Sequence, residues 1–308
     1  MCLLLVSATV RATTYYVDSV AGSESNNGTS TSTPWQSIAS TAKVNSTTFL
    51  PGDSILFKRG SSWTGNLIPK GSGTSTAPIV FDAYGTGAAP IINGGGAAQA
   101  IILWNKNYVT LQNFEILNDG TSDASRAAIR LNYVNPGVFS GVKILNNDIH
   151  NVRGYSDTAN MYDNAAIFIN ITDENGFTRV DSLLIQGNDI HDIKTIGIYQ
   201  RSPANYDVHP ELWATNMVIR GNTFDKTGDD HIIIMGANAP LIESNAGYDA
   251  GINGAGYGYI AGMWSSYFCK DAVFQYNEVA RMHNELAPTG GDAGVRHRAL
   301  RVYRGKPS

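Results

Sequence analysis

The 308-residue sequence predicts an all-β solenoid of the parallel β-helix type. A short motif, an alternating apolar strand followed by Asn, recurs with gaps between the aligned Asn residues of 41, 34, 23 and 32 positions. Periods in this range are typical of solenoids, propellers and repeat arrays, and alternation is the periodicity of strands. The unequal gaps argue against propeller blades. They suit a parallel β-helix, in which insertions loop out at the turns.

The recurring Asn predicts a stack of side chains at one turn of the solenoid. An amide group can donate and accept at once, so Asn at the same place in successive coils can hydrogen-bond along the stack. The preceding coil carries Phe114 in this slot, so we expect the stack to end there. The members of this predicted Asn ladder are Asn147, Asn188, Asn222, Asn245 and Asn277.

The repeats between Val109 and Val279 resemble those of the pectin-lyase-like superfamily. Three earlier segments, 15–18, 33–38 and 51–60, resemble the opening of secreted bacterial members. The resemblance implies a single-stranded, right-handed parallel β-helix. It specifies the reaction poorly, because the superfamily includes lyases, hydrolases, esterases, epimerases and non-catalytic proteins.

A short N-terminal capping helix is predicted over residues 34–43. Thr33 has the position of an N-cap, with Pro34 at the first helical position and Gln36 completing a capping box. The apolar residues recur at helical spacing. Such a helix would shield the open end of the core and the first strand edges. Its apolar stripe is Trp35, Ile38, Ala39 and Ala42.

The chain divides into three parts, with the β-helix domain over residues 13–292. Residues 1–12 resemble the remnant of a signal peptide, which predicts a secreted or periplasmic protein. Residues 293–308 carry five Arg or Lys residues and no acid, and they break the repeat where another strand is due. Two explanations stay open for this aberrant tail: a frameshift that truncates the solenoid, or a natural basic extension.

The charge and composition of the chain limit the classes of molecule that it can bind. The net charge is −4, and no basic face points to nucleic acid. No apolar run is long enough to span a membrane. We therefore expect a polysaccharide partner and a monomeric chain, with association only through an open C-terminal strand edge.

A second strand follows the Asn motif in each coil, and its alternation predicts two columns of side chains. The inward column is Ile129, Ile167, Ile198, Ile232 and Met263. The outward column is Arg130, Phe168, Tyr199, Ile233 and Trp264. Aromatic rings and a guanidinium suit a sugar chain, which predicts substrate binding by Arg130, Phe168, Tyr199, Trp264 and the nearby Arg201. The alternative is a face covered by a long loop.

The candidate catalytic residues are Asp229, Asp230 and His231, with Lys194 aligned one coil away. Adjacent carboxylates beside an imidazole are costly unless they are used or paired. In a glycoside hydrolase the carboxylates would protonate the leaving oxygen and activate water. The pair resembles the paired Asp of polygalacturonase-type hydrolases, whose other motifs are absent.

In a uronate lyase the base would instead be Lys194, Tyr199, Arg201 or His231, and Asp229 and Asp230 could hold Ca²⁺. Two further interpretations stay open. One is a non-catalytic glycan-binding or cell-surface β-helix, and the other is an inactive truncated fragment of an enzyme. His150 and His191 recur in register, which indicates a structural turn role, so we predict no metal ligands.

Overall fold

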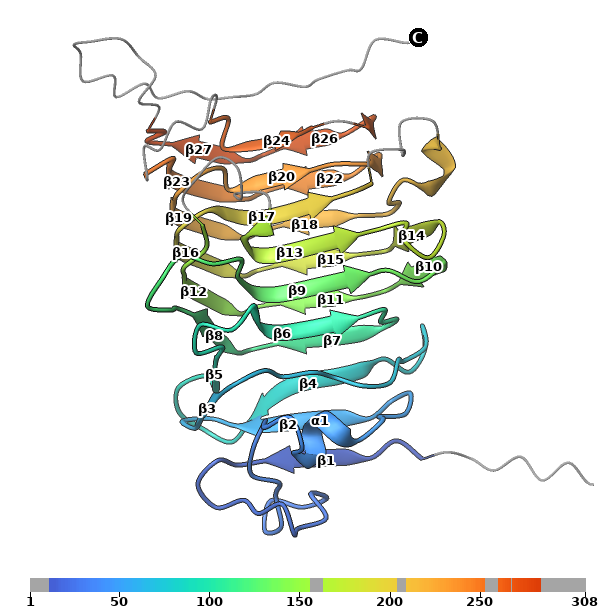
Figure 1. The fold of residues 1–308 in the computed structure, drawn as a ribbon, viewed down its shortest axis with the longest axis vertical. Coiled ribbons are helices and arrows are strands. Elements are labelled where there is room, and N and C mark those ends of the chain that lie inside the picture. Colours follow the sequence, from blue (N-terminus) through green and yellow to red (C-terminus); the bar gives the residue numbers. More distant parts are fainter. Residues whose placement is uncertain (1–10, 156–162, 204–208, 253–259, 267, 284–308) are drawn as a thin grey trace, which may run out of the picture.

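The computed structural model describes residues 11–155, 163–203, 209–252, 260–266 and 268–283. Within them the chain winds into coils stacked along one long axis, from β1 at one end to β24, β26 and β27 at the other (Figure 1). Three long sheets run along the stack, and every strand pair within them is parallel. The predicted parallel β-helix is confirmed.

The three sheets share one construction, in which each strand pairs with its counterpart in the next coil. The first sheet contains β1 (Thr14–Val17), β2 (Ser54–Lys58), β4 (Ile79–Tyr84), β7 (Val109–Gln112), β11 (Lys143–Leu145), β15 (Leu184–Gln186), β18 (Val218–Arg220), β22 (Leu241–Glu243) and β26 (Val273–Gln275). The second contains β3 (Ser62–Thr64), β5 (Ile91–Asn93), β8 (Glu115–Asn118), β12 (Asp148–Val152), β16 (Asp189–Ile193), β19 (Thr223–Thr227), β23 (Ala246–Ala250) and β27 (Glu278–Ala280). The third contains β6 (Gln99–Trp104), β9 (Ala127–Tyr133), β13 (Ala165–Ile171), β17 (Ile196–Arg201), β20 (Ile232–Ile234) and β24 (Met263–Ser265).

Smaller elements lie at the turns. Two short parallel pairs join β10 (Gly137–Ser140) to β14 (Thr178–Asp181) and β21 (Ala237–Asn238) to β25 (Cys269–Lys270). A 3-10 turn, η3, covers Pro210–Leu212. No helix in the described ranges is long and apolar enough to cross a membrane.

The core fills the space that the three sheets enclose, and its layers repeat from coil to coil. Ile129, Ile167, Ile198 and Ile232 are fully buried in it, and Met263 packs against it while half-buried. The inward column is therefore confirmed. Phe57, Phe81 and Phe114 fill the N-terminal half of the same core. This burial of apolar area is the main force that holds the coils together.

The Asn ladder is also confirmed. The Oδ1 atom of Asn188 accepts the backbone N–H and the Nδ2–H of Asn147, both at 3.0 Å, and the same pair of bonds repeats in each later coil. Each Nδ2 also donates to a carbonyl of the preceding coil, as Asn188 does to Ile144. The ladder ends at Phe114, whose backbone N–H donates to Asn147.

The predicted helix over 34–43 is wrong, although its apolar stripe is largely buried. The only α-helix in the described chain is α1 (Lys43–Ser46), and Trp35 instead bridges Val17 as an extended residue. The reason is a distant carboxylate: Glu24 accepts the backbone N–H groups of Gln36, Ser37 and Lys43. Those donors are satisfied without a helical turn. Trp35, Ile38, Ala42 and Val44 still pack onto the core, and Trp35 pairs with Val17 of β1.

The boundaries of the β-helix domain stay a prediction. The signal remnant at 1–12 and the basic tail at 293–308 lie largely or wholly outside the described residues.

Candidate active site

The outward column of the third sheet has the predicted register. Arg130 pairs with Phe168, Phe168 with Tyr199, Tyr199 with Ile233, and Ile233 with Trp264. Its exposure differs from the expected open groove, because Phe168 is 0% exposed and Tyr199 and Ile233 are each 2% exposed. They form a second apolar cluster with Trp264 packed against it. The middle of the column is therefore closer to the covered face, which was the alternative offered by the sequence, than to an open groove.

The two ends of this column remain partly accessible. Arg130 and Trp264 are both half-buried, and Arg201 is half-buried two residues beyond Tyr199. The Tyr199 and Phe168 rings are stacked with centroids 5.5 Å apart, and the Tyr199 hydroxyl contacts Met235 Sδ at 3.3 Å. Substrate binding by these residues stays a prediction, and the members accessible enough to contact a sugar are Arg130, Arg201 and Trp264.

Asp230 lies just before β20 and is held by three donors. Its Oδ1 accepts the backbone N–H groups of Ala261 at 2.8 Å and Gly262 at 2.6 Å. Its Oδ2 accepts the indole N–H of Trp264 at 2.7 Å. Burial raises its pKa to about 6, although these three donors favour the charged form and oppose the shift. The sequence could not reveal the two backbone donors, since main-chain groups leave no residue signature.

Asp229 has the opposite environment. It is 3% exposed, and its Oδ2 has no hydrogen-bond partner within the described structure. Burial, and then the negative charge of Asp230, raise its pKa to about 7. Two adjacent carboxyl groups thus differ in kind. Burial raises the pKa of both groups, but Asp230 is held by three N–H donors that favour its anion, whereas Asp229 Oδ2 has no partner.

His231 lies inside the core, which corrects its predicted place beside the carboxylates. It is 0% exposed, its Nδ1 lies 3.0 Å from Thr227 Oγ1, and its ring stacks on Phe224 at 5.3 Å. Burial lowers its pKa to about 3, so the ring is neutral near pH 7. The aligned positions hold Ala128, Ala166, Gly197 and Gly262, and these small residues were the missed signal that this slot faces inward.

The fit of His231 predicts a stability effect at Gly247. A Cβ at position 247 would lie 2.3 Å from His231 Cδ2, so Gly247→Ala forces the ring to move. We expect it to lower the free energy of unfolding by about 1–3 kcal/mol, as overpacking does. Urea denaturation measures the cost of Gly247→Ala both in the parent chain and in the His231→Ala variant. A cost that is unchanged when the ring is removed would contradict the packing account.

Lys194 is drawn away from the acid pair. Its Nζ lies 2.6 Å from Asp123 Oδ1, which Arg153 Nε also contacts at 3.1 Å. Its backbone N–H donates to Val152, and the backbone N–H of Gly228 one coil later donates to Ile193. The predicted alignment therefore holds for the backbone, while the Lys194 ammonium pairs with Asp123. Asp123 was missed because it comes from a turn outside the repeats.

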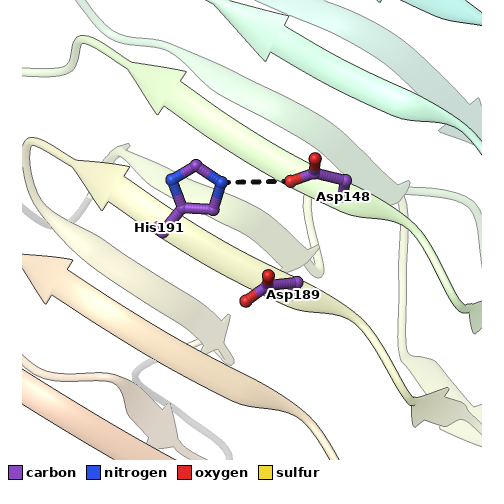
Figure 2. A group of neighbouring side chains, drawn as sticks. All are labelled: Asp148, Asp189 and His191. Carbon is purple, nitrogen blue, oxygen red and sulfur yellow. Dashed lines mark hydrogen bonds and ion pairs between the residues drawn. The ribbon is translucent and has the colours of Figure 1, made fainter. Parts of the chain in front are cut away.

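A separate polar group lies on the second sheet. Figure 2 shows His191 facing Asp148 across neighbouring strands, with Asp189 beside them. Their ligand atoms all lie within 4.8 Å of one another, a set that an ion such as Zn²⁺ can use. Each member already has protein contacts: His191 Nε2 with Asp148 at 3.2 Å, His191 Nδ1 with Asp192 at 2.8 Å, and Asp189 with Thr223 at 2.6 Å.

The pKa of His191 is set by the carboxylates around it. Burial alone would lower its pKa, but the hydrogen bond to Asp192 and the charges of Asp148 and Asp189 raise it overall. The His150 ring stacks on it with centroids 5.0 Å apart, consistent with their recurrence in register. These contacts describe a polar network between coils.

Comparison with known proteins identifies structures with the same fold. No known protein-family model matches the chain. The crystal structure of the GH136 lacto-N-biosidase from Eubacterium ramulus superposes with a TM-score of 0.78 at 24% identity, over 89% of this chain and 52% of that one. Its native form gives 0.75 at 23% identity. The chain has the right-handed parallel β-helix fold.

A curated relative supports the same alignment in sequence. Lacto-N-biosidase of Bifidobacterium longum subsp. longum is 28% identical over 93% of this chain and 23% of the relative. The chain thus spans about a quarter of that relative and about half of the matching solved structures.

Proposed function

We propose that this chain is the β-helix part of a secreted glycoside hydrolase that cleaves a glycan with Asp229 and Asp230. The observation that carries the proposal is a pair of adjacent buried carboxyl groups just before β20, of which Asp230 is held by three N–H donors while Asp229 Oδ2 has no partner. Such pairs are what glycoside hydrolysis requires, one as acid and one as anion. The similarity to a lacto-N-biosidase over 93% of the chain supports a hydrolase and suggests a lacto-N-bioside as the first substrate to try.

The environments assign the two roles. Asp229, with the higher pKa, is the general acid that gives its proton to the leaving glycosidic oxygen as the C–O bond breaks. Asp230, oriented by Trp264, Ala261 and Gly262, is the carboxylate that attacks the anomeric carbon or removes a proton from the attacking water. His231 is a core residue in this mechanism.

A calcium-dependent lyase is the weaker interpretation. Calcium is held by six to eight oxygen ligands, and the lone pairs of Asp230 are mostly occupied by its three N–H donors. Lys194, a candidate base, is engaged with Asp123. These residues do not fit a Ca²⁺ site at the acid pair.

The pair predicts a bell-shaped pH profile for kcat/KM with its maximum between the two values. Activity rises as Asp230 ionises near pH 6 and falls as Asp229 loses its proton near pH 7. Trp264→Phe removes a donor that favours the Asp230 anion, so the acidic limb should move upward. A profile that Trp264→Phe leaves unmoved would contradict the positioning role of Trp264.

The reaction class is tested by incubating the chain with a chromogenic lacto-N-bioside, other neutral glycans and polyuronates. New reducing ends without ultraviolet absorbance by unsaturated uronate support the hydrolase. Unsaturated uronate ends would establish a lyase instead. Retention on a glycan column with no cleavage would favour the non-catalytic glycan-binding alternative.

A further inference from the structure

We propose that Arg130 and Arg201 form a subsite for an anionic substituent of the glycan, a carboxylate or a sulfate ester. The inference rests on the proposed function in taking the ligand to be a glycan. It adds a charged recognition element at a second place on the face that carries the acid pair.

Both guanidinium groups lie against the same phenyl ring. The Cζ atom of Arg130 lies 4.6 Å from the Phe168 ring centroid, and the Cζ of Arg201 lies 5.4 Å from it. Arg130 is on β9 and Arg201 on β17, the strands on either side of β13, which carries Phe168. The β-helix stack therefore holds two like charges at one place, which is unfavourable without a counter-charge.

The available counter-charge is incomplete within the described residues. Arg201 Nη1 pairs with the Asp163 carboxylate, while its Nε and Nη2 donate to Asn170 Oδ1 at 3.1 and 2.8 Å. Arg130 has one long contact, from Nη2 to the Asp163 carbonyl at 3.4 Å. The Asp163 carboxylate thus pairs directly with Arg201, while Arg130 contacts only the backbone carbonyl of that residue.

The Nε–H of Arg130 is the most direct sign of a missing partner. The Nε atom is buried and has no hydrogen-bond partner in the described structure. A buried N–H without an acceptor costs about 1–3 kcal/mol. Burial, and to a smaller extent the charge of Arg201, lowers the pKa of Arg130, while Asp163 opposes the shift. An incoming anion would relieve both the unmet donor and the repulsion.

The donor geometry favours an oxyanion over a hydroxyl. A guanidinium presents a planar fork that matches the two oxygens of a carboxylate or sulfate. The Nε and Nη2 atoms of Arg201 already donate to Asn170 Oδ1, so this edge orients the guanidinium and a ligand would use the remaining N–H groups. Asn170 itself is held by Asn132 at 2.6 Å.

The subsite lies on the same face of the third sheet as the acid pair but at a different place. Arg201 ends β17, whereas Asp230 precedes β20 in the next coil, so the two lie at opposite ends of neighbouring strands. A strand rises about 3.3 Å per residue, which separates them by more than one sugar unit. The anion would thus be recognised away from the bond that is cleaved.

The test measures the binding of small anionic probes and their neutral counterparts to the full chain, by thermal shift and NMR titration. The probes are galacturonate, its methyl ester, galactose 6-sulfate, galactose and inorganic sulfate. We expect galacturonate or galactose 6-sulfate to bind and the ester and galactose to bind at least about tenfold more weakly, with affinity falling as salt rises. Comparison of the two anionic sugars separates a carboxylate from a sulfate.

Variants assign the binding to these residues. Arg130→Gln and Arg201→Gln should each weaken the bound anion about tenfold or more, and Arg130→Lys should weaken it less. Arg220→Gln is the matched control, because Arg220 is exposed on the first sheet and contacts Gln186 there. If Arg130→Gln does not fold, Arg201→Gln and Arg130→Lys carry the test.

The inference is overturned if the methyl ester binds as tightly as the acid, if no probe binds, or if Arg220→Gln weakens binding as much as Arg130→Gln. Binding of inorganic sulfate alone, without either anionic sugar, would also overturn a glycan subsite. Asp229→Asn should leave anion binding intact. Arginine-dependent binding by a chain that cleaves nothing would therefore refute the hydrolase while supporting the subsite.

Discussion

Replacing Asp229 by Asn is expected to make the folded protein more stable near pH 8 while slowing hydrolysis about 10²–10⁴-fold. The pKa of Asp229 is raised from 3.8 to about 7, so the folded state prefers the neutral acid. The stability that this group contributes is present at low pH and is lost as pH rises from the unfolded pKa through the folded one. The Asn side chain carries no charge to bury, and the variant should recover on the order of a few kcal/mol at pH 8.

The contrast with Asp230→Asn makes this prediction specific. An Asn side chain there can still accept from Ala261 and Gly262, but its NH₂ group would face the Trp264 N–H, donor against donor. We expect this variant to gain less stability at pH 8 than Asp229→Asn, because loss of the Trp264 hydrogen bond costs about 1–3 kcal/mol and offsets the removal of a buried charge. Urea denaturation at pH 8 and pH 5 measures both effects. Equal changes in the stability of both variants would contradict the difference between the two environments.

Removing one central member of the Asn ladder is expected to be the most destabilising single substitution on the turns. Asn188→Ala leaves the backbone N–H and Nδ2–H of Asn147 and the carbonyl of Ile144 without their partner. Unsatisfied buried groups each cost about 1–3 kcal/mol, so the loss should reach about 3 kcal/mol or more.

Asn277→Ala provides the matched comparison, because Asn277 makes the same kinds of contact at a part-buried position near the last described coil. It should cost clearly less than Asn188→Ala in the same urea experiment. Equal losses of stability would contradict the idea that the cost of removing a ladder Asn depends on how deeply it is buried.

The repeating parts of the fold could be predicted because they depend on local periodicity. One strand phase per coil sets the register of Arg130, Phe168 and Tyr199, and one amide per turn sets the Asn ladder. Periodicity wrongly predicts a helix around Trp35. A stripe at helical spacing also suits an irregular segment whose N–H groups are satisfied by Glu24, which is 12–19 residues away in sequence.

The candidate site could be predicted only in part. Strict alternation places His231 outside, but two consecutive positions face inward where each strand of the third sheet begins, as Ala128 and Ile129 do. The burial of Phe168 depends on what covers the sheet, which a repeat pattern does not encode. The different environments of Asp229 and Asp230 arise from backbone donors one coil away.

The most direct test of the central claim is kcat/KM for a chromogenic lacto-N-bioside in the parent chain, Asp229→Asn and Asp225→Asn. Asp225 is a partly exposed carboxylate of β19, in the coil that also carries the pair, so it controls for loss of one charge. We predict that Asp229→Asn lowers kcat/KM by about 10²–10⁴-fold, while Asp225→Asn stays near the parent value. Cleavage by a folded Asp229→Asn variant at the parent rate would show that the acid pair does not perform the hydrolysis.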